Sequence, residues 1–248
     1  MIISKTKEEL VIMRKAGRIV AQVLQAIEKM AAPGITTEEL DRQAQKIIRE
    51  AGAEPAFLGY RGFPASICTS INEELVHGIP GIRRLKEGDI LSIDAGVRFQ
   101  GYYGDAAITL PIGKISKNAR RLIKVTQGAL EKAVEQVRIG NHLSDISYAV
   151  QTYVESFDFS VVRNYVGHGI GTRMHEPPEV PNFGLPGKGP RLREGMVLAI
   201  EPMVNIGSWE VEILNDQWTV VTADRSLCAH FEHTVAVTSG GPEILTLL

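Results

Sequence analysis

The sequence predicts an α+β fold made of two similar halves, each with two helices followed by two strands. Gly34 and Gly140, 106 positions apart, each follow a long helical pattern and precede a shorter one. The motif Gly-x-x-Leu-x-Ile-acid occurs at 88–94 and again at 195–201, an offset of 107. A chain of 248 residues is long enough to bury a large core. The predicted domain is 1–248, with duplicated units of approximately 1–115 and 116–248.

Helix signals open the first half. Thr6-x-x-Glu9 and Thr36-x-x-Glu39 are capping boxes, in which the two side chains bond each other's backbone N–H groups. Apolar residues then recur at helical spacing, up to Pro33-Gly34 after the first box and up to Gly52 after the second. Two helices are therefore expected before residue 53.

Loops and strands follow these helices. Residues 59–80 are rich in Gly, Pro, Ser and aromatic side chains, which is typical of loops, and two apolar strands joined near 99–101 come next. In the second half, helices are expected over 116–137 and 143–154. Strands that end in Glu201 and Glu232 are expected after Gly-rich loops.

Composition excludes several classes of protein. The net charge of −2 gives no electrostatic reason to expect direct nucleic-acid recognition or attachment to an anionic membrane. No apolar run reaches the roughly 18 residues of a membrane span. Cys68 and Cys228 are the two cysteines, which indicates a reducing compartment, and residues 1–9 lack the pattern of a secretion signal. We expect a cytoplasmic protein.

Four carboxylates and one histidine lie in apolar, strand-like sequence: Asp94, Asp105, His168, Glu201 and Glu232. An ionised carboxylate in such surroundings is costly unless it is paired or bound to metal. Two divalent cations would balance four such charges. Oxygen-rich ligand sets with one imidazole suit Mn, Fe(II) or Co, and Zn remains open.

The spacing of two of these carboxylates indicates that they lie on the two strands of one hairpin. Asp94 and Asp105 are eleven positions apart, so a hairpin centred between Phe99 and Gln100 would place them directly opposite each other. Opposed like charges destabilise a bare sheet, whereas a metal between them turns the pair into two ligands. Two metals about 3.5–4 Å apart can activate a shared water and polarise a carbonyl, so hydrolysis is the expected reaction.

The histidines differ in what their surroundings indicate. His168 lies in Gly167-His168-Gly-Ile-Gly171, where glycines leave room for a ligand or a tight backbone turn, so it is expected to be a ligand or catalyst. His175 and His77 are candidate proton donors or carbonyl-polarising groups, although each alone is more often an ordinary polar loop residue. That ordinary interpretation is kept for His142, His230 and His233.

Five ordered segments carry a family resemblance: Ser70 to Pro80, Asp94 with Gly101 to Asp105, Gly167 to Pro178, Ala199 to Met203, and Phe231 to Thr234. Together they closely resemble the methionine aminopeptidases of type 1, over essentially the whole chain. The resemblance implies the pita-bread fold, in which two pseudo-symmetric halves place helices outside a curved antiparallel sheet. The 25 residues between His175 and Glu201 leave no room for the insertion of type 2 members, which favours the compact bacterial form.

The resemblance also implies a ligand set. It assigns two divalent ions (Co, Mn, Fe(II) or Zn) to Asp94, Asp105, His168, Glu201 and Glu232. Asp105 and Glu232 would bridge both ions, His168 and Glu201 would complete one shell, and Asp94 would serve the other ion.

Roles for three side chains follow from the same resemblance. Glu201 would accept and donate a proton, His175 would stabilise the developing oxyanion, and His77 would hold the backbone of the second residue. The implied activity is removal of the initiator methionine from nascent chains with a small second residue. The implied partners are nascent polypeptide N-termini and the ribosome near the exit tunnel, and a monomer is expected.

A methionine side chain needs an apolar slot, and a thioether makes favourable contacts with ring edges. By position, the resemblance assigns this slot to Phe57, Tyr60, Phe63, Cys68, Met174 and Trp218. Without it, each would be interpreted as core packing. Phe57 stands where a cysteine is frequent in bacterial members, and Met174 where phenylalanine is frequent.

Three alternatives remain. A peptidase of the same fold could prefer an X-Pro bond, and a non-catalytic peptide binder could retain the fold without activity. A mononuclear iron oxygenase needs only two histidines and one carboxylate, which would leave three carboxylates unexplained.

Overall fold

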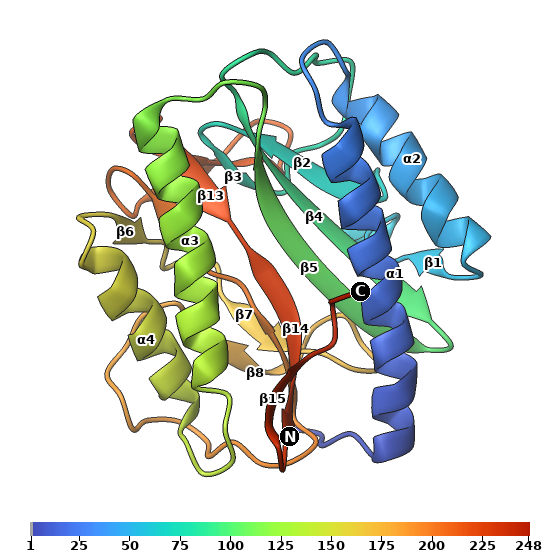
Figure 1. Ribbon diagram of the computed structural model, residues 1–248, viewed down its shortest axis with the longest axis vertical. Helices are drawn as coiled ribbons and strands as arrows, with labels where there is room; N and C mark the ends of the chain where they lie inside the picture. The colour runs from blue at the N-terminus through green and yellow to red at the C-terminus, as the bar shows by residue number, and fades with distance from the viewer. Residues whose placement is uncertain (1) are drawn as a thin grey trace.

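The computed structural model describes residues 2–248, which form helices packed outside a large sheet (Figure 1). The helices are α1 (Lys7–Met30), α2 (Thr37–Glu50), η1 (a 3₁₀ turn, Tyr60–Gly62), α3 (Lys117–Glu135) and α4 (Leu143–Glu155). The strands of the first half are β1 (Glu54–Pro55), β2 (Ile67–Ile71), β3 (Glu74–Val76), β4 (Ile90–Phe99) and β5 (Tyr102–Pro111). Those of the second half are β6 (Ser160–Val161), β7 (Gly167–Gly169), β8 (Glu176–Val180), β9 (Val197–Ile200), β10 (Met203–Asn205), β11 (Val211–Ile213), β12 (Val220–Thr222), β13 (Cys228–His230), β14 (Glu232–Thr238) and β15 (Gly241–Ile244).

Both predicted capping boxes of the first half are present. The Thr6 hydroxyl accepts from the Glu9 N–H and the Glu9 carboxylate accepts from the Thr6 N–H, and Thr36 and Glu39 make the same pair of bonds. The predicted helices of the second half are also confirmed, and the Ser116 hydroxyl caps α3 by accepting from the Ala119 N–H. The segment expected to be loop between 59 and 80 is partly wrong, because it also contains β2 and β3.

The main sheet is antiparallel, with the strand order β1-β4-β5-β14-β9-β7-β8, and β2 and β15 pair with β4 and β14. The strands of each half therefore lie on their own side, and the halves meet where β5 pairs with β14. In Figure 1, α1 and α2 lie over the part of the sheet formed by the first-half strands, and α3 and α4 lie over the part formed by the second-half strands. The prediction that a strand ends in Glu232 is wrong, since Glu232 begins β14 after the short strand β13.

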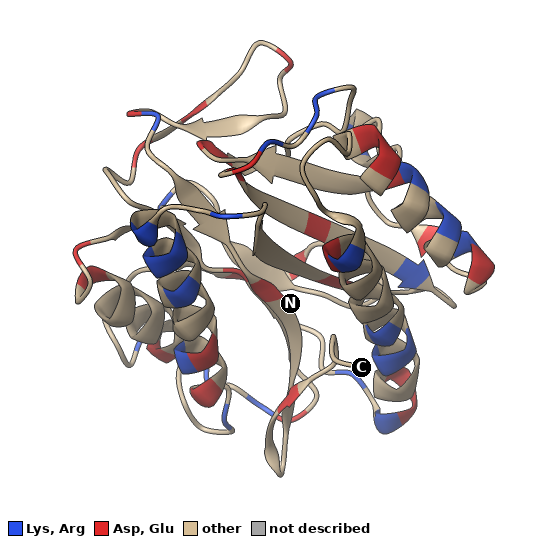
Figure 2. Cartoon of the chain, turned by 45° about the horizontal axis from the view of Figure 1, so that its top comes forward, with Lys and Arg blue, Asp and Glu red and all other residues tan. Residues whose placement is uncertain are grey.

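Each helix pair has its own hydrophobic core against the sheet. Leu91 and Ile93 of β4 pack with the α1 and α2 side chains, and Leu198 of β9 and Val235 of β14 pack with those of α3 and α4. Because successive strand residues point to opposite faces, Asp94 points away from the helices. Figure 2 shows most Lys, Arg, Asp and Glu positions on helices and loops, with a few acidic positions interrupting the strands between the helix pairs.

The β4–β5 hairpin has a different register from the predicted one. Its turn is Gln100-Gly101, with φ of 47° and 86°, so Phe99 pairs with Tyr102. Two residues with positive φ are typical of the tight turn that matches strand twist. Asp94 consequently pairs with Ala107, not with Asp105. The two carboxylates share a face but lie diagonally, and the expectation that they are directly opposed is wrong.

Across residues 2–248, no helix combines the length and apolar character needed to cross a membrane.

Candidate active site

The five predicted ligands come from five different strand segments and point to the same side of the main sheet. Asp94 lies on β4, Asp105 on β5, His168 on β7, Glu232 at the start of β14, and Glu201 directly after β9. The residues next to them in the sequence, such as Ile93, Ala106 and Ile200, point the other way and belong to the cores beneath the helices. Strand alternation therefore brings these carboxylates to one surface from positions far apart in the sequence.

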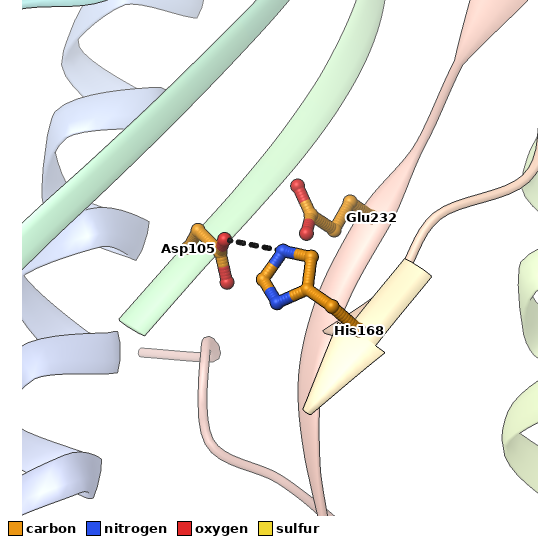
Figure 3. Close-up of side chains that lie close together, drawn as sticks. All are labelled: Asp105, His168 and Glu232. Carbon is orange, nitrogen blue, oxygen red and sulfur yellow. Dashed lines mark ion pairs between the residues drawn. The ribbon is translucent and has the colours of Figure 1, made fainter. Parts of the chain in front are cut away.

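Asp105, His168 and Glu232 form the tightest group (Figure 3). One ligand atom from each lies within 4.8 Å of the others, and all three residues are buried. The His168 Nε2 lies 3.5 Å from Asp105 Oδ2 and 3.7 Å from Glu201 Oε1. Distances of this kind leave space for a cation among the groups.

The protonation of His168 is set by its own loop. Its Nδ1 lies 2.8 Å from the Gly169 carbonyl oxygen, so Nδ1 carries the proton and donates it there. The lone pair is then on Nε2, which faces Asp105 and Glu201. A backbone carbonyl that fixes the ring in this way is the usual support of a metal-binding histidine.

The two glycines that flank His168 are required by close backbone contacts. A Cβ on Gly167 would lie 2.4 Å from the Ala199 carbonyl oxygen, and a Cβ on Gly169 would lie 2.3 Å from that of Pro177. These distances are far below van der Waals contact, so only glycine lets β7 approach β8 and β9 here. The glycines are therefore needed for strand packing, while their predicted role in leaving room for a ligand stays a prediction.

The carboxylates are held in surroundings that oppose their ionisation. Burial, followed by repulsion from neighbouring carboxylates, raises the pKa of Asp94, Glu201 and Glu232 well above the usual range. Burial raises the pKa of Asp105 to about 6. Asp105 and Glu201 lie within 4 Å of histidine nitrogens, and within residues 2–248 no Lys or Arg pairs with any of the four carboxylates.

These side chains fit divalent cations. Oδ1 of Asp94 is buried and has no hydrogen-bond partner among the described residues. Such an orphaned acceptor, next to three further carboxylates and a histidine lone pair, is an unfavourable arrangement unless positive charge is bound. Oxygen donors with one imidazole match the preferences of Mn, Fe(II), Co and Zn.

One cavity of ≈ 150 Å³ connects all the site residues predicted from the sequence. Its lining consists of Phe57, Tyr60, Arg61, Phe63, Cys68, His77, Asp94, Asp105, His168, Met174, His175, Glu201, Trp218 and Glu232. The apolar members lie beside the acidic group, so an apolar side chain bound there would have its backbone near the carboxylates.

His175 and His77 occupy defined positions in this cavity. The His175 ring centroid lies 4.2 Å from that of His168, and its Nδ1 lies 2.8 Å from the Tyr60 hydroxyl oxygen. His77 packs edge-on against Tyr165 and Trp218, with centroid distances of 5.7 and 6.3 Å. Burial, followed by repulsion from a neighbouring histidine, lowers the pKa of both rings to about 4, so both are neutral at pH 7.

The backbone at His77 is strained. His77 has φ of 61°, which non-glycine residues adopt rarely. The next residue is tightly packed, because a Cβ on Gly78 would lie 2.2 Å from the Thr69 carbonyl oxygen. Backbone strain of this kind is retained where the surrounding structure enforces it, and it often marks functional sites.

Sequence reasoning missed several residues of this site. Arg61 lines the cavity, and the Thr234 hydroxyl lies 3.0 Å from Asp105 Oδ1. His230, interpreted as an ordinary loop residue, is instead 2% exposed, and its Nε2 lies 3.8 Å from Glu201 Oε2. A signal was available for His230, because it precedes Glu232 by two positions and extended chains place such residues on the same side.

Comparisons with known proteins agree with this geometry. The model of metallopeptidase family M24 matches residues 11–239. The methionine aminopeptidase of Clostridium acetobutylicum is 58% identical over 100% of this chain and 99% of its own length. Methionine aminopeptidase 1 of Bacillus subtilis is 57% identical over 99% of each chain.

Solved structures show the same fold. The crystal structure of methionine aminopeptidase from Thermotoga maritima superimposes with a TM-score of 0.99 at 46% identity, and the match covers 100% of both chains. The fold class expected from the sequence, α+β with the pita-bread arrangement, is thereby confirmed. The family match spans both halves of the sheet and every residue of the acidic group. The chain belongs to metallopeptidase family M24.

Proposed function

We propose that the protein is a methionyl aminopeptidase, a metal-dependent hydrolase that releases the N-terminal methionine from polypeptides with a small second residue. The observation that supports this most strongly is the cavity in which four carboxylates and His168 adjoin an apolar slot. Full-length similarity to methionine aminopeptidases at 57–58% identity agrees with the proposal.

The acidic group would hold two divalent ions, with Co, Mn, Fe(II) and Zn as candidates. The proposed ligands are Asp94, Asp105, His168, Glu201 and Glu232. Such ions lower the pKa of bound water and polarise a carbonyl oxygen. The unpaired Asp94 Oδ1 and the Nε2 lone pair of His168 support this assignment.

The protein's own side chains would transfer the proton, stabilise the oxyanion and position the substrate. Glu201 follows β9 at the cavity and is 15% exposed, so it can accept a proton from the attacking water and return it to the leaving amine. His175 is neutral and hydrogen-bonded to Tyr60. It would donate a hydrogen bond to the oxygen of the first peptide carbonyl as negative charge develops on that oxygen. His77 would contact the backbone of the second residue.

The apolar part of the cavity would bind the methionine side chain. Met174, Phe63 and Cys68 are 3–5% exposed, and Phe63 packs edge-on against Trp218 at 5.1 Å. Phe57 and Tyr60 complete the lining. Sulfur in the thioether would then lie against ring edges, which is its favourable geometry.

The biological setting forms part of the proposal. Substrates would be nascent polypeptide N-termini, met in the cytoplasm and near the ribosomal exit tunnel by a monomeric enzyme. Residues 1–248 would act as one catalytic domain, with the duplicated units 1–115 and 116–248 each supplying two carboxylates.

A direct test compares Met-Ala-Ser with Ala-Pro-Ala as substrates under several metals. The proposal requires faster release from Met-Ala-Ser. Faster cleavage of the proline peptide would instead establish the X-Pro alternative, and binding of both peptides without turnover would establish a non-catalytic binder.

A further inference from the structure

A buried ion pair connects the N-terminal segment to the part of the chain that carries His175. The Lys5 Nζ lies 2.7 Å from Glu176 Oε2, and the two side chains are 4% and 1% exposed. These residues are 171 positions apart in the sequence. Ion pairs with both members this deeply buried are costly in desolvation and need close geometry to persist.

Both members of the pair have further partners. Lys5 Nζ also donates to the Ile3 carbonyl oxygen at 3.0 Å, and the Lys5 N–H donates to the Gly195 carbonyl oxygen at 2.7 Å. The other oxygen of Glu176, Oε1, accepts from the Arg173 N–H at 3.1 Å and from the Thr172 hydroxyl at 3.3 Å. Glu176 therefore joins a fixed point before α1 to the turn 171–175.

The stem of Lys5 also lies against this turn. A Cβ on Gly171 would be 2.3 Å from Lys5 Cε, so the lysine occupies the space beside the Gly171 backbone. The Gly171 carbonyl oxygen accepts from the Tyr103 N–H at 2.9 Å, and the Gly171 N–H donates to the Arg173 carbonyl oxygen at 3.2 Å. Contacts with the N-terminal segment and with β5, together with a hydrogen bond inside the turn, thus fix its position.

Two cavity residues are carried on the turn. Met174 and His175 directly precede Glu176, and both line the cavity. A shift of the turn would move the His175 ring relative to His168, from which it is separated by 4.2 Å. Displacements of about 1 Å at a catalytic group can cost on the order of 100-fold in rate.

We propose that Lys5 and Glu176 are positioning residues, which set the depth at which the turn 171–175 places His175 in the cavity. This inference rests on the proposed function, because it takes His175 as the group that stabilises the oxyanion. Neither residue lines the cavity. Their effect is transmitted through the backbone of one turn.

The test uses Lys5→Met, Glu176→Gln and the double variant, each as the full chain loaded with Co. Arg14→Met is the matched control, since Arg14 also forms an ion pair, with Glu243, but is 41% exposed and lies outside the cavity lining. We expect kcat on Met-Ala-Ser to fall at least about tenfold in each single variant with KM nearly unchanged, because an oxyanion contact acts mainly in the transition state. The control should keep wild-type kcat and KM.

The double variant separates positioning from stability. Each single variant leaves one buried charge unpaired and is expected to lower Tm, whereas the double variant removes both charges and should recover Tm. Under the proposal its kcat stays low, because the contact between Lys5 Nζ and Glu176 that ties the turn to the N-terminal segment is still missing. Recovery of kcat together with Tm would overturn the proposal and make the pair purely structural.

A readout without turnover keeps this inference distinct from the proposed function. In ¹⁵N-histidine NMR spectra of the metal-free protein, the His175 signals should shift in Lys5→Met and remain unchanged in Arg14→Met. Unchanged His175 signals in Lys5→Met would also overturn the proposal. A wild-type protein that releases no methionine would refute the proposed function, while the NMR result would still decide whether the pair positions His175.

Discussion

The hydroxyl of Thr234 on β14 lies 3.0 Å from the Asp105 carboxylate on β5, and it also accepts from the Asp105 N–H at 3.1 Å. Both residues are buried, with 0% and 2% of their surfaces exposed. The hydroxyl also lies 2.8 Å from the Asp105 carbonyl oxygen, so this one threonine holds both the backbone and the carboxylate of a proposed ligand across the boundary between the two halves of the sheet. Hydrogen bonds to the outer side of a ligand are a common means of tuning a metal site.

Thr234→Val should weaken metal binding by about 10–100-fold, because it keeps the side-chain shape but removes the hydroxyl that orients Asp105. Calorimetric titration of the metal-free protein with Mn measures this change. Thr234→Ser, which keeps the hydroxyl, is the matched control. Equal affinities for the valine variant and the wild type would show that Asp105 is oriented by other contacts.

Glu201→Ala should abolish peptidase activity while the fold is retained. Loss of a general acid–base group typically costs about 10²–10⁴-fold in rate. Removing one of four clustered carboxylates also relieves repulsion, so the metal-free variant should unfold at or above the wild-type temperature. Turnover close to that of the wild type would contradict the assigned role.

The buried carboxylates should lower the stability of the metal-free protein as pH rises above their unfolded-state pKa of about 4. Folded-state pKa values raised by burial, as for Asp94, Glu201 and Glu232, give stability at low pH that is lost on ionisation. The contribution of Asp105, whose folded-state pKa is about 6, is lost between about pH 4 and pH 6.

Below about pH 6.5, the buried histidines change the stability in the opposite direction, so that it rises with pH. Their lowered pKa values make them destabilising below the unfolded-state pKa of about 6.5, and this contribution ends once both states are neutral. Thermal unfolding in chelator at pH 7.0 and 7.5 therefore follows the carboxylates, above the histidine range and below the range in which the thiols of Cys68 and Cys228 ionise in the unfolded chain. Glu201→Gln should show a smaller decrease, and an equal decrease in that variant would disagree with this origin.

Gly169→Ala should destabilise the protein by about 1–3 kcal/mol, the usual cost of forcing atoms into a packed site. The new Cβ would meet the Pro177 carbonyl oxygen at 2.3 Å, which pushes β8 away from β7 and disturbs His168. Chemical denaturation and metal titration would both register the change. Gly240→Ala, where the nearest atom is 3.7 Å away, should have little effect on either.

Met174→Ala should raise KM for methionine peptides and lower stability by about 2–5 kcal/mol, because Met174 is 3% exposed and forms part of the cavity wall. Steady-state kinetics on Met-Ala-Ser would separate KM from kcat. An unchanged KM would place the methionine slot elsewhere.

The helices and the acidic group could be predicted because their signals are local. The capping boxes at Thr6 and Thr36 determine helix starts within four residues, and a charged residue such as Asp94 in an apolar strand is visible in the sequence itself. The family resemblance then supplied roles that no spacing indicates.

The errors arose where the outcome depends on tertiary pairing. The register of the β4–β5 hairpin is set by the positive φ of Gln100, a conformation that the sequence pattern does not display. β3 was missed because a three-residue strand exists through its pairing with β12, far along the chain. The burial of His230 likewise depends on β13 pairing with β10.

Metal titration of the protein under reducing, anaerobic conditions tests the dimetal proposal most directly. Metal-free wild-type protein should bind two equivalents of a divalent ion and regain methionine release in proportion, and Glu232→Gln should lose both the second equivalent and the activity. Full methionine release by chelator-treated protein with no bound metal would contradict a mechanism that depends on these carboxylates holding cations.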